Sequence, residues 1–387
     1  MDEADDWYHK SLAILKDLSD RPGMARSYHQ LGTVAQDRGQ LDEADDWYHK
    51  SLAILKDLSD RPGMARSYHQ LGTVAQDRGQ LDEADDWYHK SLAILKDLSD
   101  RPGMARSYHQ LGTVAQDRGR LDEADDWYHK SLAILKDLGD RLGMARSYHQ
   151  LGTVAQDRGR LDEADDWYHK SLAILEDLGD RLGMARSYHQ LGMVAQDRGR
   201  LDEADDWYHK SLAILEDLGD RLGMARSYHQ LGIVAQHRGR LDEADDWYHK
   251  SLAILEDLGD RLGMARSYHQ LGIVAQHRGR LDEADDWYHK SLAILKDLGD
   301  RPGMASTYHQ LGIVAQHRGR LDEALDWVIR CVTVFEEFPH PAMDPSSRFL
   351  ARLATVLGMP ALESSWQKIT GRPLPPTVRR HVQQPDN

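Results

Sequence analysis

An arginine, a histidine and a glutamine recur at a fixed spacing along this chain, and they are the residues that could carry out recognition chemistry. Arg26, His29 and Gln30 return after forty residues and again in each further block. A guanidinium group matches a carboxylate through two parallel hydrogen bonds, and a glutamine amide both donates to and accepts from a peptide backbone. The pattern therefore predicts non-covalent binding of an extended, acidic or polar protein segment.

The candidate partner-binding residues form an arginine row, a histidine row and a glutamine row, with additions near the C-terminus. The arginine row is Arg26, Arg66, Arg106, Arg146, Arg186, Arg226 and Arg266; the histidine row is His29, His69, His109, His149, His189, His229 and His269; the glutamine row is Gln30, Gln70, Gln110, Gln150, Gln190, Gln230 and Gln270; the additions are Ile233, Ile273, Ile313, His237, His277 and His317. Charged surface rows are commonly just solvated, so a purely structural interpretation of these rows stays open.

The additions mark a difference between early and late repeats. Isoleucine takes the place of Thr33 in the late repeats, and histidine takes the place of Asp37. The binding surface is therefore expected to become more apolar and less acidic toward the C-terminus. Drift among recently duplicated units is the alternative explanation.

The sequence gives little indication of a catalytic site, a metal site or a cofactor site. The sequence contains no phosphate-binding glycine loop, no H-E-x-x-H and no G-x-S-x-G motif. Asp45 and His49 lie one helical turn apart, but a metal site needs three or four converging ligands. Cys331 lies on a helix that is expected to be packed, which disfavours a nucleophile. We predict a protein that is not an enzyme, with no cofactor and no metal.

Charge and composition restrict the class of partner. The formal net charge is -15, from 64 acidic and 49 basic residues, and such a chain would repel a nucleic-acid backbone. The single cysteine excludes an intrachain disulfide. Residues 1–10 lack the pattern of a signal peptide, and no apolar run is long enough to span a membrane. We expect a cytoplasmic protein that binds neither nucleic acid nor membrane.

The candidate residues lie on a repeated helical unit of forty residues. Within Leu41–Leu58 the apolar residues are three, four and seven positions apart, which predicts one apolar stripe on an α-helix. Asp60 is a suitable N-cap for a second helix near Pro62–Asp77, whose first turn tolerates proline. One antiparallel helix pair cannot cover its own apolar stripe, so such units must stack on their neighbours.

The unit also carries a signature of aromatic, Leu-Gly, small and Ala positions, at Tyr28, Leu31, Gly32, Ala35, Ala44, Tyr48 and Ser51. This signature resembles that of tetratricopeptide repeats, in the forty-residue class of kinesin light chains, polarity adaptors and bacterial regulatory proteins. The resemblance covers about residues 1–337 and implies that the face bearing Arg26 lines a concave groove. The Lys and Asn of the family's clamp for C-terminal carboxylates are absent at His29 and Thr33, which disfavours a chaperone-tail ligand.

The predicted fold class is all-α, an α-solenoid forming a right-handed superhelix of antiparallel helix pairs with a short helical C-terminal cap. We expect residues 1–19 to be an orphan second helix of a partial repeat and residues 20–337 to be eight tandem helix pairs. Residues 338–370 are expected to be the cap, and residues 371–387 a flexible, proline-containing basic tail.

The leading functional prediction is a protein–protein interaction scaffold that binds an extended or helical partner segment in its groove. The alternative is the sensor or autoinhibitory arm of a larger bacterial signalling ATPase of the STAND type. A third interpretation is a self-assembling solenoid, in which the N-terminal helix exposes Trp7, Leu12 and Leu15 and docks on another copy.

Overall fold

The computed structural model describes residues 2–335 and 344–383, and these residues form helices and no strand. The all-α prediction is confirmed. Residues 1–198 and residues 199–387 form two compact units, each of which is described by itself. Residues 338–343 of the predicted cap and 384–387 of the predicted tail lie outside the described residues.

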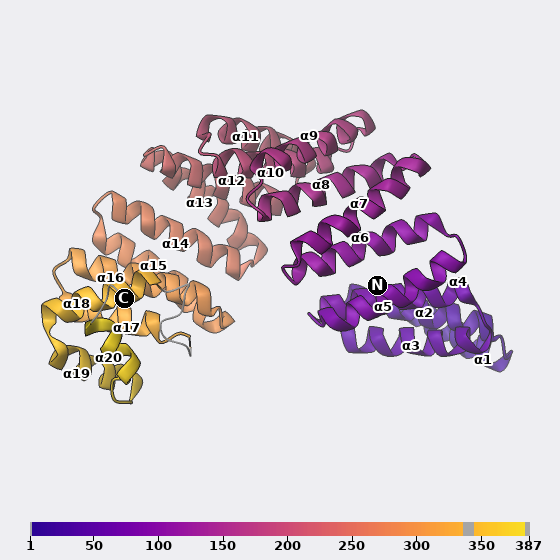
Figure 1. Ribbon diagram of the computed structural model, residues 1–387, viewed down its shortest axis with the longest axis horizontal. Coiled ribbons are helices and arrows are strands. Elements are labelled where there is room, and N and C mark those ends of the chain that lie inside the picture. The colour runs from indigo at the N-terminus through magenta and orange to yellow at the C-terminus, as the bar shows by residue number, and fades with distance from the viewer. Residues whose placement is uncertain (1, 336–343, 384–387) are drawn as a thin grey trace. The chain divides into compact units, whose positions relative to one another are not determined.

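In the first unit, helices of two types alternate along the chain (Figure 1). The first type comprises α2 (Arg21–Asp37), α4 (Arg61–Asp77), α6 (Arg101–Asp117), α8 (Arg141–Asp157) and α10 (Arg181–Asp197). The second type comprises α1 (Asp2–Asp17), α3 (Leu41–Asp57), α5 (Leu81–Asp97), α7 (Leu121–Leu138) and α9 (Leu161–Leu178). Each of α2, α4, α6 and α8 packs against the second-type helix that follows it, as the helix-pair prediction requires.

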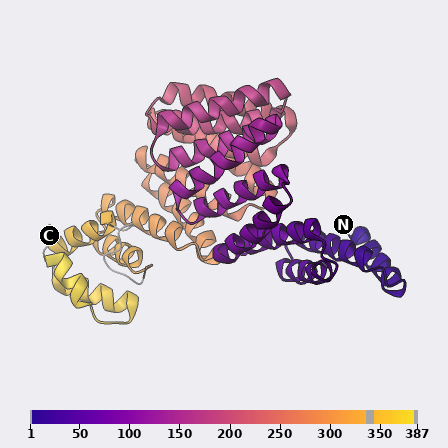
Figure 2. The same ribbon diagram turned by 45° about the vertical axis from the view of Figure 1, so that its right-hand side comes forward.

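The second unit continues the alternation and ends in three further helices (Figure 2). Its first-type helices are α12 (Arg221–His237), α14 (Arg261–His277) and α16 (Arg301–His317). Its second-type helices are α11 (Leu201–Leu218), α13 (Leu241–Leu258), α15 (Leu281–Leu298) and α17 (Leu321–Val332). The last three are α18 (Asp344–Leu357), α19 (Met359–Thr370) and α20 (Pro376–Gln383).

The helix ends follow the predicted capping chemistry. The carboxylate of Asp60 accepts a hydrogen bond from the backbone N–H of Gly63 at 2.9 Å, and Pro62 lies in the first turn of α4. Gly139 ends α7 in the left-handed conformation, with φ +67°. Ser59 takes the corresponding position after α3 with φ +53°, a conformation that costs energy for a residue other than glycine.

A glycine–tyrosine contact holds the two helices together in the pairs α2–α3, α4–α5, α6–α7, α8–α9, α12–α13 and α14–α15. The ring of Tyr88, from α5, is fully buried against Gly72 of α4, where an added Cβ would lie 2.7 Å from the ring atom Cε1. Ser91 reinforces the same pair by donating its hydroxyl hydrogen to the carbonyl of Ala65 at 2.8 Å. Leu111 and Val114 of the next helix, α6, then cover Tyr88 in one hydrophobic cluster.

The predicted C-terminal cap forms and extends further than the sequence indicated. Phe349, Trp366 and Val378, from the three last helices, join one buried cluster with Val328 of α17. The expectation of a flexible tail is wrong for Pro376–Gln383, which forms α20, because the sequence pattern did not reveal that its two valines are buried under the cap.

The apolar face of α1 differs in detail from the expectation. Trp7 is 68% exposed and Leu18 is 70% exposed, whereas Leu12 is only 4% exposed. Leu18 follows the end of α1, Trp7 lies on its exposed side, and Leu12 is buried. Leu15 is partly buried and lies against Gly23 of α2. Exposure of Leu12 was therefore a wrong expectation.

We predict that Gly72→Ala lowers the free energy of unfolding by about 1–3 kcal/mol, because the new methyl group must displace a buried aromatic ring. The matched control is Gly312→Ala in the last repeat, where the nearest atom is Cγ2 of Val328 at 3.0 Å and the nearest ring atom, Cε1 of Phe349, lies at 3.4 Å. Urea unfolding followed by circular dichroism measures both. Equal losses for the two variants would contradict the proposed role of the tyrosine ring.

Candidate partner-binding surface

The candidate residues share one face of the first-type helices, here called the binding face and defined by the positions of Arg26, His29, Gln30 and Thr33 in each repeat. Two pockets open on this face in the first unit. The pocket between α4 and α6 measures about 550 Å³, and the pocket between α8 and α10 measures about 480 Å³. The binding face is therefore hollowed at places where two neighbouring repeats meet.

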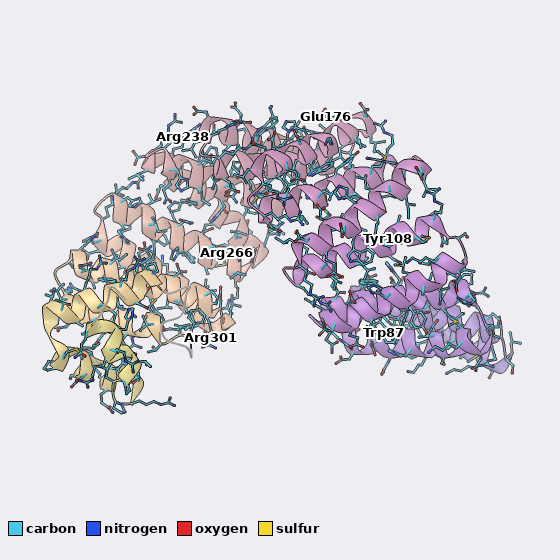
Figure 3. All side chains as sticks on the ribbon, viewed as in Figure 1. Trp87, Tyr108, Glu176, Arg238, Arg266 and Arg301 are labelled. Carbon is cyan, nitrogen blue, oxygen red and sulfur yellow. The ribbon has the colours of Figure 1, made fainter. Side chains whose placement is uncertain are left out.

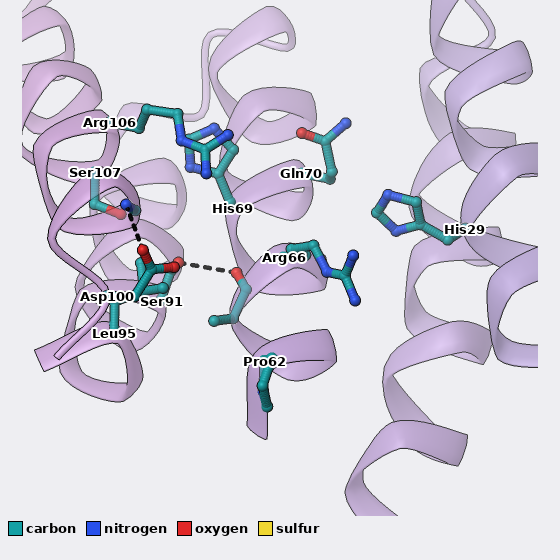
Figure 4. A pocket seen from close by; sticks show the side chains of 12 residues that line it. His29, Pro62, Arg66, His69, Gln70, Ser91, Leu95, Asp100, Arg106 and Ser107 are labelled. Carbon is teal, nitrogen blue, oxygen red and sulfur yellow. Dashed lines mark hydrogen bonds between the residues drawn. The ribbon is translucent and has the colours of Figure 1, made fainter. Parts of the chain in front are cut away.

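In the pocket between α4 and α6, cationic and amide groups from adjacent repeats converge. Arg66, His69 and Gln70 project from α4, with Arg106 of α6 on one side and His29 of α2 on the other (Figure 4). The pocket between α8 and α10 has the equivalent lining, with arginine, histidine and glutamine from α8 and an arginine from α10. The structure thus brings the predicted rows together at these pockets.

The arginine row is exposed and unpaired. Among the described residues, none of its seven members forms an ion pair with a carboxylate. Arg266, the last member, projects from α14 in the second unit (Figure 3). Other arginines of the repeat are paired: Arg61 lies 2.6 Å from Asp97, and Arg78 lies 2.6 Å from Asp42. The row therefore keeps its hydrogen-bond donors available for an external carboxylate.

The histidine row is partly buried rather than simply solvated. His69 packs edge-on against the ring of Tyr88, with ring centroids 5.4 Å apart. Burial, together with the charge of Arg106, lowers the pKa of His69 to about 4. The ring is therefore neutral at neutral pH, and positive charge on the binding face comes from the arginines.

The tyrosine of the helix-pair contact also reaches the binding face. The hydroxyl of Tyr88 lies 3.2 Å from both Thr73 Oγ1 and Gln76 Oε1, and it accepts a hydrogen bond from Gln110 Nε2 at 3.3 Å. Gln76 in turn donates to Asp117 of the next repeat at 3.0 Å. The buried hydroxyl of Tyr88 thus positions the amide group of Gln110 on the binding face. The sequence predicted only a packing role for this tyrosine.

The isoleucines that replace threonine in the late repeats take part in core packing. Ile233, Ile273 and Ile313 are partly buried and pack against the hydrophobic clusters of the second unit. Where isoleucine replaces threonine, Tyr288 retains the hydrogen bond to Gln276 at 3.0 Å. His237, His277 and His317 are exposed. The apolar side chains are therefore divided between internal packing and the binding face.

Other candidate chemistries have ordinary local environments. The Nδ1 atom of His49 lies 3.1 Å from the carbonyl oxygen of Asp45, and the described residues contain no group of three or more metal-ligating side chains. Cys331 donates its thiol hydrogen to the carbonyl of Ala305 at 3.1 Å, and burial raises its pKa to about 11. Across 2–335 and 344–383, no helix has the length and apolarity needed to cross a bilayer.

Two kinds of pocket residue escaped the sequence reasoning. Ser107 is fully buried, lines the pocket between α4 and α6 and has no hydrogen-bond partner for its hydroxyl. Leu142 and Leu182 line the pocket between α8 and α10, where the earlier pocket has Pro62. The sequence did contain a signal, because this position changes from proline to leucine between repeats. Only the structure shows that the leucine side chains line a pocket.

A family model described as tetratricopeptide repeat matches residues 1–57, 63–137, 103–177, 143–217, 183–257, 223–297 and 263–337. The chain belongs to the tetratricopeptide repeat family. The predicted family is thereby confirmed. No curated protein sequence gives a significant match.

Several solved structures are similar to this chain, and those with a TM-score above 0.5 share its fold. A putative kinesin light chain from Podospora anserina with nearly identical TPR-like repeats is 26% identical, with a TM-score of 0.44 over 51% of this chain and 97% of that chain. The STAND protein PH0952 from Pyrococcus horikoshii, with a tetratricopeptide repeat sensor, is 14% identical, with a TM-score of 0.61 over 84% and 52%. The apo quorum sensor NprR from B. thuringiensis is 12% identical, with a TM-score of 0.60 over 97% and 100%.

The histidine row predicts a specific acid sensitivity. Its buried members titrate near pH 4 when folded and near 6.5 when unfolded, so the unfolded chain binds more protons as the pH falls below 6.5. Stability is therefore complete above pH 6.5 and is lost toward pH 4, by about 1 kcal/mol per histidine at pH 5.5. Changing His69, His109 and His149 to Gln should reduce this loss, measured by urea unfolding at pH 7.5 and 5.5.

The matched control changes His89, His129 and His169 to Gln on the second-type helices, where each histidine is about half exposed. This variant should retain the acid sensitivity of the wild type. If both triple variants lose the same stability between the two pH values, the buried row is not its source.

Proposed function

We propose that this protein is a non-catalytic interaction scaffold whose binding face holds an acidic segment of a partner protein. The observation that carries the proposal is the arginine row, in which seven equivalent arginines face outward without a carboxylate partner among the described residues. A cytoplasmic location, expected from the single cysteine, belongs to the same proposal.

Electrostatics support an acidic ligand despite the negative net charge of the chain. The acidic side chains Asp42 and Asp97 are paired with arginines away from the row. Gln76 donates a hydrogen bond to Asp117, and Asp100, the one carboxylate among the described residues lining the pocket between α4 and α6, accepts from the backbone N–H of Gly103 at 3.0 Å. The guanidinium groups of Arg66 and Arg106 line the same pocket and form no ion pair among the described residues. Since the pocket recurs between α8 and α10, a ligand that contacts several repeats gains avidity from equivalent weak contacts.

We predict that the triple variant Arg106→Glu, Arg146→Glu and Arg186→Glu reduces partner capture at least tenfold, because each change replaces an attraction to a carboxylate with a repulsion. Affinity capture from the native cell, with quantitative mass spectrometry of wild type and variant side by side, measures the change. Unaltered capture would reject a role of the arginine row in binding.

A control with the same charge change is available within the chain. Lys56, Lys96 and Lys136 are exposed at a position where later repeats carry Glu176, so their change to Glu reproduces a natural residue of the same fold. This variant should capture the partner as well as the wild type does. Equal loss in both variants would indicate net charge, and not the binding face, as the determinant.

A second candidate function is a sensor arm of a larger signalling ATPase. The similarity to PH0952, described as a STAND protein with a tetratricopeptide repeat sensor, favours it. The exposed Trp7 and Ile14 on α1, with Leu18 directly after it, offer a surface for an adjoining part of such a protein. The intact mass of the native protein distinguishes this candidate from a free-standing scaffold.

A further inference from the structure

The two pockets of the first unit share their polar lining but differ in one element. Both pockets have a leucine of the second-type helix in their lining, Leu95 and Leu175, but Pro62 borders the pocket between α4 and α6, whereas Leu142 and Leu182 border the pocket between α8 and α10. The change at this position is systematic. Proline stands at Pro22, Pro62, Pro102 and Pro302, and leucine stands at Leu142, Leu182, Leu222 and Leu262.

The helix itself gains nothing from leucine at this position. Proline fits the first turn of a helix because its backbone angle is fixed in advance and its missing N–H has no partner there. The N-cap is the same in both kinds of repeat: Asp140 accepts from Gly143 at 2.9 Å, as Asp60 accepts from Gly63. Leu142 is 37% exposed, so part of its apolar surface stays open to a ligand.

What leucine does change is the pocket. Leu142 and Arg146 lie four residues apart on α8, which places their Cα atoms about 6 Å apart along the helix axis. In an extended peptide, side chains two residues apart point to the same side and are separated by about 6.6 Å. An extended segment can therefore place a carboxylate on the arginine and an apolar side chain on the leucines at the same time.

We propose that the leucine-type repeats select an acidic residue accompanied by a large apolar side chain two positions away, in an extended segment of a partner protein. The inference rests on the proposed function and specifies its ligand. Proline-type repeats recognise the acidic residue alone, and Leu142 and Leu182 act as specificity-determining residues.

The test uses nine-residue fluorescent peptides and the full chain. One peptide has Leu-Ser-Glu-Ser-Leu at its centre, which presents the spacing in both chain directions; the others have Gly-Ser-Glu-Ser-Gly and Leu-Ser-Gln-Ser-Leu. Fluorescence anisotropy should show the leucine–glutamate peptide binding about tenfold more tightly than the glycine–glutamate peptide, because it buries apolar surface against the leucines. The glutamine peptide should bind weakly, since it lacks the carboxylate.

The decisive variant changes Leu142, Leu182, Leu222 and Leu262 to Pro. Its fold is protected because Gly-Asp-Arg-Pro-Gly already occurs at 299–303 and begins α16. The variant should bind the glycine–glutamate peptide like the wild type and lose the preference for leucine; unchanged far-UV circular dichroism confirms that it is folded.

The outcomes separate the inference from the function on which it rests. Equal affinity of the wild type for the two glutamate peptides overturns the inference and leaves the proposed function standing. A leucine preference that survives the four proline substitutions also overturns it. Affinity that does not depend on glutamate counts against both.

Discussion

The structure depends on one close contact, the placement of a tyrosine ring on a glycine of the partner helix. At Gly72 and Tyr88 the two helices approach so closely that a methyl group in place of the glycine hydrogen would overlap the ring. The contact fixes the distance between the helices, and it fixes the height of the tyrosine hydroxyl relative to the binding face. Because that hydroxyl positions Thr73, Gln76 and Gln110, the core contact also arranges the surface.

Ion pairing divides the arginines of each repeat into two functional groups. Arg61 and Arg78 form ion pairs with carboxylates that lie 36 residues away in the chain. Each exposed pair contributes little to stability, but together such pairs provide cationic partners for aspartates of the second-type helices. Arg66, on α4, lines the pocket between α4 and α6 and has no such partner among the described residues. An acidic chain thereby keeps a cationic surface.

Some residue differences between repeats preserve a contact within the chain, and others change a surface. Lys56 lies over the ring of Tyr68, and where the lysine becomes Glu176 the hydroxyl of Tyr188 donates to the new carboxylate at 3.2 Å. The same contact is thus maintained by different chemistry. The change from proline to Leu142 instead adds an apolar side chain that is 37% exposed and borders a pocket.

Helix boundaries and pairing could be predicted because they depend on local patterns: apolar spacing, the Asp60 cap, Pro62 and Gly139 all act within a few residues. The family signature followed from the same positions. The formation of α20 could not be predicted, because the burial of Val378 depends on helices that the local sequence does not specify.

For the binding face, the sequence by itself determined which residue types recur and on which side of the helix they lie, since a period of 3.6 residues fixes their direction. Only the tertiary structure decided that the arginine row forms no ion pair among the described residues, that His69 is buried against a tyrosine, and that Leu142 borders a pocket. The physical reason is that each of these environments is made by a neighbouring repeat, about forty residues away, whose approach is set by packing and not by local spacing.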